Sequence, residues 1–260
     1  MRSPQGPKII IGGGVSCDSL SVVRWLRQHN DIDIQLTNRS GYKIGSFFSC
    51  NKKPFNMESV QEYICSWKKE FSRKRVDHTP GYLSSEAAPV NISCLAPEAK
   101  IVFVMRDPIV RLEKHLTAAI AEQESWSIAL LRKFNQPHVI LKTLVSKPIP
   151  GIMAYESEKA LWEGIYNVHL ERYKNYIPRD KMHYIIYERL REQPEQELKK
   201  LCNFLEIKYT DKSNILFETK RTPIWTQIPR NTKAFLKDYY KKSVYSLRKI
   251  VGEDIPEWGY

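Results

Sequence analysis

Short apolar runs alternate with stretches of helical periodicity along this chain. The clearest run is Ile101–Met105, which follows the turn-like segment 97–100 and predicts a strand buried on both faces. Further strands are expected at residues 8–11, 32–36 and 182–187. Between them, helical spacing predicts helices at about 16–29, 56–71, 108–119, 158–176 and 194–205, and a last one capped by Asn231.

This order of elements predicts an α/β fold with a doubly wound, mainly parallel central sheet flanked by helices. A length of 260 residues favours a single domain spanning 1–260. Residues 122–160 are weakly patterned and are interpreted as an insertion that shapes a pocket. The basic run Arg73–Arg75 is expected to form a solvated turn.

Charge and cysteine content narrow the classes of partner. Forty-one Lys and Arg residues against 29 Asp and Glu leave a net charge of +12, which favours polyanions such as sulfated glycans or phosphorylated cofactors. No nucleic-acid-binding signature accompanies the charge, so no nucleic acid is expected as a partner. No window approaches a membrane span. Five scattered cysteines with no CxxC pair predict no metal site and leave a Cys50–Cys65 disulfide open.

Two stretches carry candidate anion-binding chemistry. Gly12–Gly14 joins the first strand to the first helix, as a phosphate-cradling loop would, although an ordinary turn is the alternative. The Walker pattern fails because no lysine follows, and Cys17 stands where the dinucleotide pattern needs its third glycine. The second stretch is Arg106-Asp107-Pro108, where an arginine ends a strand and Asp107 can cap the next helix. Its alternative is a strand–helix joint with a solvated arginine.

Taken together, these segments resemble the sulfotransferases that use 3′-phosphoadenosine 5′-phosphosulfate (PAPS), specifically the heparan-sulfate glucosaminyl N- and 3-O-sulfotransferases. Residues 33–38, Asp-Ile-Gln-Leu-Thr-Asn, are similar to that family's Glu-Ile-Gln-Phe-Phe-Asn. Residues 78–82 resemble its Lys-Thr-Pro-Ser-Tyr turn, with histidine in the lysine's place. Residues 234–240 and 255–258 are similar to its C-terminal helix. The resemblance implies a P-loop-like sulfotransferase fold.

The resemblance also implies roles for individual residues. Arg106, Arg111 and Lys114 would hold the donor's 3′-phosphate, with Lys114 at the family's serine position. Lys220 and Arg221 match a loop that lies over the cofactor.

In the same resemblance, Asp33 would be the catalytic base, and its strand is expected to place it at the carboxyl edge of the sheet. His78 would assist as an acid or a second base. The alternatives are an exposed acid at a strand end and a structural histidine.

The first loop departs from the family pattern. The donor's 5′-phosphosulfate would be held by backbone N–H groups and hydroxyls of Gly12, Gly13, Gly14, Ser16, Cys17 and Ser19. The loop is one residue shorter than in the family and has no lysine, and Asp18 adds a negative charge.

These observations predict an enzyme that moves a sulfonate group from PAPS to a hydroxyl or amine of a saccharide, without a metal. Small-molecule acceptors are the alternative within that class. A catalytically degenerate protein that binds anionic glycan or nucleotide is the alternative in another class. The third alternative is a dinucleotide-binding oxidoreductase that uses Gly12, Gly14 and Asp33. In such a protein the Arg-Asp-Pro segment would have no function. The compartment is expected to be cytoplasmic for a complete chain, or the Golgi lumen if an anchor has been trimmed.

Overall fold

The structure is a computed structural model, and it describes the chain in segments. These are residues 6–34, 44–49, 57–65, 73–121, 158–210, 215–217 and 228–260. The chain divides into two compact units. The first contains Met1–Met105 and His169–Glu218, and the second contains Arg106–Val168 and Thr219–Tyr260. A single domain over 1–260 stays a prediction, and most of the predicted insertion lies outside the described residues.

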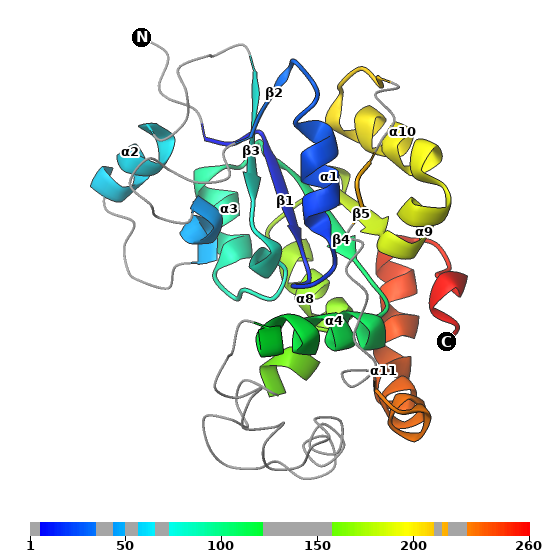
Figure 1. The fold of residues 1–260 in the computed structure, drawn as a ribbon. Helices are drawn as coiled ribbons and strands as arrows, with labels where there is room; N and C mark the ends of the chain where they lie inside the picture. The colour runs from blue at the N-terminus through cyan, green and yellow to red at the C-terminus, as the bar shows by residue number, and fades with distance from the viewer. Residues whose placement is uncertain are drawn as a thin grey trace. The chain divides into compact units, whose positions relative to one another are not determined.

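The first unit is built on a parallel five-stranded sheet of order β2-β3-β1-β4-β5 (Figure 1). The strands are β1 Ile9–Gly13, β2 Ile32–Ile34, β3 Lys74–His78, β4 Lys100–Met105 and β5 Met182–Ile186. This confirms the predicted doubly wound fold. The strand order reverses between β1 and β4, and ligands of such sheets collect at the carboxyl ends of the strands beside this point.

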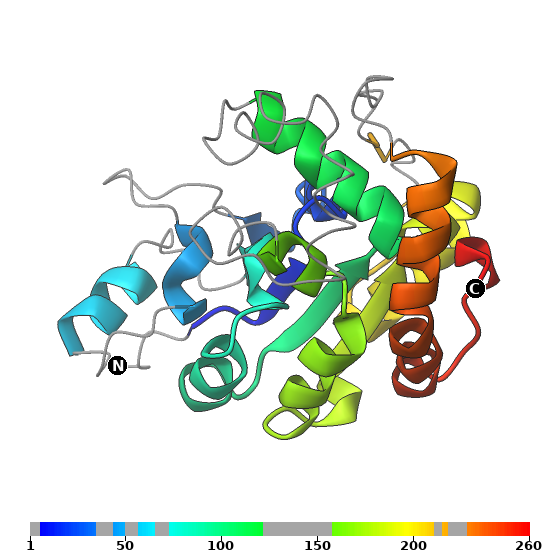
Figure 2. The same ribbon diagram turned by 90° about the horizontal axis from the view of Figure 1, so that it is seen from below.

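Helices cover both faces of this sheet. Figures 1 and 2 show α1 and α10 on one face and α3 on the opposite face. The α-helices of the unit are α1 Ser19–Leu26, α2 Met57–Cys65, α3 Ala88–Leu95, α9 Tyr187–Glu192 and α10 Pro194–Leu205. Short 3-10 turns occur at η1 Ile44–Ser49, η2 Pro80–Tyr82 and η3 Arg179–Lys181. The apolar runs of β1 and β4 are buried throughout, as expected for strands with helices on both sides.

The expectation of a solvated turn at Arg73–Arg75 is wrong, because β3 begins there. Lys74 directs its Nζ to the carbonyl oxygens of Leu205 and Glu206 at the end of α10, at 2.7 and 2.9 Å. A cation at a helix C-terminus is favoured by the helix dipole and by the unpaired carbonyls there. Arg75 is buried. The basic run is therefore part of the fold of the sheet.

The second unit contains α4 Pro108–Ala121, α11 Arg230–Val251 and η5 Pro256–Trp258, and α4 packs against α11 (Figure 2). The helix expected over 158–176 is interrupted. The chain turns at Gly164 and restarts as α8, Tyr166–Lys174, which crosses the boundary of the units. A Cβ on Gly164 would come 3.0 Å from the Tyr240 ring, whose hydroxyl donates to the carbonyl of Leu161 at 2.9 Å. The turn thus accommodates a buried tyrosine of α11.

The start of α11 also differs from the expectation. The helix begins one residue before Asn231, with Pro229 at the capping position. Asn231 Oδ1 accepts only from its neighbour Thr232 among the described residues, through the N–H at 2.8 Å and, weakly, the hydroxyl. A proline at this position fixes φ near its helical value, which favours the start of a helix without a side-chain cap.

Candidate functional site

The middle residue of the glycine loop at the end of β1 has to be a glycine. Gly13 has a φ of 141°, and a Cβ there would lie 2.4 Å from the carbonyl oxygen of Val104. Only glycine fits this close approach to β4. The N–H of Gly14 then donates to the same carbonyl at 3.2 Å. The predicted loop is therefore a specific structure, held against the neighbouring strand at the point where the strand order reverses.

Between this loop and α1, two residues adopt the left-handed backbone conformation. Ser16 and Asp18 have φ values of 69° and 60°, and Cys17 between them is buried. Asp18 precedes the helix without a side-chain hydrogen bond to its first turn. The start of α1 therefore has no cap from the Asp18 side chain, and the helix dipole favours negative charge there.

Ser19 and His78 meet at the start of α1. Ser19 Oγ lies 2.9 Å from His78 Nε2, although 59 residues separate them in the sequence. Ser19 is the first residue of α1, and His78 ends β3 directly beside Ile11 of β1. Burial lowers the pKa of His78 to about 4, so its imidazole is neutral at pH 7. A neutral histidine can exchange a hydrogen bond with Ser19, but it carries no positive charge for a phosphate.

A buried carboxylate holds the end of β3 in place. Asp77 accepts hydrogen bonds from the hydroxyls of Tyr63, Tyr82 and Thr79 at 2.6, 2.9 and 3.1 Å. Tyr173 donates in turn to the carbonyl of Tyr82 at 2.7 Å. Burial raises the pKa of Asp77 to about 6, and the three hydroxyls oppose that rise.

This hydroxyl cluster, consisting of Asp77, Tyr63, Tyr82 and Thr79, is absent from the sequence predictions. The sequence around Asp77 does not reveal hydrogen-bond donors that come from other elements. The cluster fixes the strand residue immediately before His78, and so it determines where the imidazole lies.

Asp33 does not lie where it was expected. The register of β2 on β3 places it beside Arg75, three residues before His78, and therefore away from the carboxyl end of β3. Its Oδ2 is buried and has no hydrogen-bond partner in the part of the chain that the structure describes. Gln35, two residues further along the chain, lies outside the described residues.

In the second unit, the Arg-Asp-Pro segment forms the predicted start of α4. Asp107 Oδ1 accepts from the N–H groups of Ile109 and Val110 at 2.8 and 3.0 Å, which confirms its role as the cap. Burial raises the pKa of Asp107, and these two bonds oppose the rise. Tyr166 donates to the carbonyl of Arg106 at 2.8 Å, and the Arg106 side chain is only 2% exposed. The alternative, a strand–helix joint with a solvated arginine, is therefore wrong.

Arg111 is committed to neighbours within the same unit. Its Nη1 lies 3.1 Å from Glu163 Oε2, its Nη2 donates to the carbonyl of Ala160, and the side chain is fully buried. Lys114, one turn after Arg111 on α4, is half-buried. Lys220 and Arg221 lie outside the described residues.

The predicted site residues thus fall into two groups. The structure brings the glycine loop, Ser19 and His78 together in the first unit, and in the second it places Arg106 just before α4 and Arg111 and Lys114 along its first turns. Asp33 belongs to neither group.

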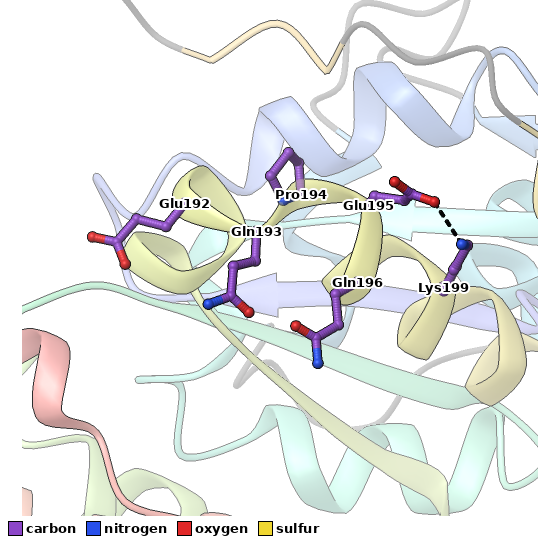
Figure 3. A pocket seen from close by; sticks show the side chains of 6 residues that line it. All are labelled: Glu192, Gln193, Pro194, Glu195, Gln196 and Lys199. Carbon is purple, nitrogen blue, oxygen red and sulfur yellow. Dashed lines mark hydrogen bonds and ion pairs between the residues drawn. The ribbon is translucent and has the colours of Figure 1, made fainter.

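A surface pocket lies elsewhere in the first unit, around the junction of α9 and α10 (Figure 3). It contains none of the predicted residues. Its lining is Glu192, Gln193, Pro194, Glu195, Gln196 and Lys199. Lys199 pairs with Glu195 at 2.5 Å, and the acids outnumber the one lysine. This lining suits a phosphorylated nucleotide poorly.

Two further properties concern the described residues alone. Within these segments, no three His, Cys, Asp or Glu side chains gather in a way that would hold a metal ion. Among the helices that the structure describes, none has both the length and the apolar composition needed to cross a bilayer.

Comparison with known protein families gives one match over most of the chain. The profile described as "Sulfotransferase domain" matches residues 20–227. Human heparan sulfate glucosamine 3-O-sulfotransferase 3B1 is 24% identical over 85% of this chain and 52% of its own length. The bifunctional heparan sulfate N-deacetylase/N-sulfotransferase 1 of Xenopus tropicalis is 20% identical over 97% of this chain and 31% of its own length. The chain thus spans about half or less of these relatives.

Solved structures share the fold. A sulfotransferase from Alicyclobacillus acidocaldarius superposes with a TM-score of 0.70 and 18% identity, covering 98% of this chain and 99% of that one. A mouse sulfotransferase complexed with PAP superposes with a TM-score of 0.51 and 13% identity, covering 92% of this chain and 84% of that one. At these identities the similarity shows a common fold.

Proposed function

The chain belongs to the sulfotransferase domain family, and from that premise we propose that it transfers a sulfonate group from PAPS to a hydroxyl or amine of a saccharide. The observation that carries this proposal is the meeting of Ser19 and His78 at the start of α1, directly after the glycine loop. The saccharide class is taken from the heparan sulfate relatives, and the nucleotide from the family and from the neighbour complexed with PAP.

The first unit fits the phosphosulfate end of such a donor. The glycine loop leaves backbone N–H groups at the start of α1 with no side-chain cap, and Ser16 and Ser19 add hydroxyls. We assign His78 the task of orienting the Ser19 hydroxyl toward the anion. Because the pKa of His78 is lowered to about 4, we assign it no role as an acid at neutral pH.

In the second unit, Arg106 is our candidate for the 3′-phosphate. Its side chain is buried just before α4, and a guanidinium suits a phosphate because it donates several charge-assisted hydrogen bonds. Arg111 fits a phosphate less well, because Glu163 and the carbonyl of Ala160 already occupy its guanidinium. We therefore assign Arg111 to the support of α4 and retain Lys114 as a second cation.

When bound, PAPS would supply the sulfonate group and provide the leaving nucleotide. The residues of the chain would position the acceptor and remove its proton as the sulfur–oxygen or sulfur–nitrogen bond forms. Asp33 remains our candidate base because Oδ2 is buried and lacks a partner in the described residues. Its register, three residues before His78, makes His78 the alternative base.

Calorimetry with two nucleotides tests the donor site. Arg106→Ala should weaken binding of 3′,5′-adenosine diphosphate ~10–100-fold and leave 5′-adenosine monophosphate unaffected, since only the first has a 3′-phosphate. Arg24→Ala, at an exposed arginine of α1, is the matched control and should change neither. Equal losses for both nucleotides would show a general structural effect, and no loss for either would remove Arg106 from the site.

A specific observation favours the non-catalytic alternative. The first loop has no lysine, and Asp18 places a carboxyl group where the loop meets α1. A protein of this kind would bind 3′,5′-adenosine diphosphate but fail to transfer labelled sulfonate to either a saccharide or a small alcohol. Gly14→Lys tests the cause, because Gly14 lacks the positive φ of Gly13 and its backbone conformation therefore does not require glycine. Turnover gained by this variant would identify the missing charge as the defect.

A further inference from the structure

We propose that the exposed face of α11 is a docking surface for a linear sulfated polysaccharide. The helix carries seven Lys and Arg residues and one Asp, an excess of six that is half of the chain's net charge of +12. A charge excess concentrated in one helix attracts a polyanion much more strongly at that place than elsewhere.

Six of the seven basic residues share one face of the helix, and the seventh, Lys233, pairs with Glu113. At 100° per residue, Arg230, Lys237, Lys241, Arg248, Lys249 and Lys242 fall within an arc of about 140°. The buried residues of α11, which include Leu236, Tyr240 and Leu247, occupy the opposite side. We call this set of six cations, with Tyr245 and Asp238 among them, the α11 basic face.

Among the described residues, most of these cations form no ion pair with an acid. Lys237, Lys241, Lys242 and Lys249 are exposed and form no ion pair within the described residues. Arg248 is different, because it approaches Asp254 at 3.7 Å. Lys199 and Lys200 of α10 offer a contrast, since each pairs with a glutamate of its own helix. The charge of α10 is thus balanced locally, and the charge of α11 is left for a partner.

The shape of the face suits a linear polymer. From Arg230 to Lys249 it extends ~28 Å along a straight helix. Tyr245 is 43% exposed between the cations, and its ring stacks under the Arg248 guanidinium at 4.9 Å. An exposed ring among cations can contact the apolar face of a sugar while the cations bind its sulfates. The polysaccharide class, though not the surface, rests on the proposed saccharide acceptor.

Two triple variants with equal charge change test the surface. The first is Lys241→Gln, Lys242→Gln and Lys249→Gln, on the α11 basic face. The matched control is Lys8→Gln, Lys159→Gln and Lys208→Gln, at three exposed lysines outside α11. The probe is a size-defined heparin oligosaccharide, with a single-stranded oligodeoxynucleotide of equal charge beside it.

The α11 variant should lose ~10-fold or more in heparin affinity at low salt, and its dependence on salt should become shallower by about two ions. The control should lose less than ~2-fold, because it changes net charge but not the surface. Equal losses in both variants, or tighter binding of the oligodeoxynucleotide than of heparin by the unaltered protein, would overturn the proposal.

Titration with 3′,5′-adenosine diphosphate separates this proposal from the donor site. Neither triple variant should alter nucleotide affinity. A protein that binds heparin through α11 but binds no nucleotide would leave the docking surface standing and refute the proposed transfer. A protein that binds nucleotide but has the same heparin affinity with and without the α11 cations would refute the docking surface and leave the proposed transfer standing.

Discussion

Asp77 in the first unit and Glu163 in the second are both buried carboxylates, yet their partners are of opposite kinds. Asp77 is surrounded by three neutral hydroxyls, whereas Glu163 faces the guanidinium of Arg111. Hydroxyls stabilise a carboxylate only by hydrogen bonding, so burial still raises the pKa of Asp77 to about 6. In the Arg111–Glu163 pair, each charge is stabilised by the opposite charge of its partner. Removing one of the two residues leaves the other as a buried charge without a counter-ion, which is strongly destabilising.

The largest effect is therefore expected from breaking the ion pair. Arg111→Met should destabilise the protein by ~3–5 kcal/mol, because Glu163 would be left charged and buried. The double variant Arg111→Met, Glu163→Leu should recover most of that loss, since it removes both charges. Urea denaturation of the single and double variants measures both values. A small cost for the single variant, or no recovery in the double, would contradict the interpretation of this pair.

The double variant also tests the phosphate role that the sequence implied for Arg111. If Glu163 and Ala160 account for the buried guanidinium, affinity for 3′,5′-adenosine diphosphate should be almost unchanged in the folded double variant. A loss like that expected for Arg106→Ala would return Arg111 to the donor site.

The hydroxyl cluster should respond to pH, which sharpens the contrast. Asp77 has a raised pKa in the folded state, so its contribution to stability is fully present below about 4 and is lost as pH rises through about 6. Compared with Asp77→Asn, the unaltered protein should gain on the order of 2–3 kcal/mol on acidification across this window. The measurement is the difference between the two unfolding free energies at each pH.

Buried histidines change the stability with pH in the opposite direction. Their contribution cancels when the unfolding free energy of Asp77→Asn is subtracted from that of the unaltered protein. Burial lowers the pKa values of His78 and His183 to about 4, so their contribution falls as pH drops below 6.5. Both are present in the protein and in Asp77→Asn. A difference that is flat between pH 4 and 7 would show that Asp77 does not titrate there.

Removing one hydroxyl from the cluster should have a smaller effect. Tyr63→Phe deletes the 2.6 Å hydrogen bond to Asp77, and the loss of a bond to a carboxylate costs ~1.5–2 kcal/mol at pH 7. It should also move the Asp77 transition to higher pH, because that hydroxyl favours the charged form. Tyr176→Phe, at an exposed tyrosine, is the control and should change stability little. Equal losses in the two variants would argue against a special role for Tyr63.

The sequence predicted well those features that depend on neighbours along the chain. Buried strands, the cap at Asp107 and the helix after Pro194 follow from local apolar runs and capping residues, and the structure confirms them. The first loop and His78, which the sequence analysis named separately, follow from neighbouring parallel strands that end at one edge of the sheet.

Features that depend on distant contacts were missed or misplaced. The hydroxyl cluster needs donors from α2 and η2. The helix breaks at Gly164 because the ring of Tyr240 in α11 packs closely against it. The position of Asp33 along the sheet depends on the register in which β2 pairs with β3, and no turn residue in the sequence fixes that register. Long-range pairing, not local propensity, decides these positions.

The smallest effect is expected where both charges of a pair are exposed, and α10 offers a matched test. Lys199 and Glu195 are 53% and 69% exposed, whereas the Glu197 partner of Lys200 is only 3% exposed. Lys199→Gln should cost ~0.5 kcal/mol or less, because water screens both charges, and 1 M salt should abolish the effect. Lys200→Gln should cost more, ~1 kcal/mol, and keep much of that cost in salt, since it strands a buried carboxylate. Urea denaturation at low and high salt measures both. Identical, salt-sensitive losses would mean that burial of the acid does not govern the strength of these pairs, and the contrast between Asp77 and Glu163 would then need another cause.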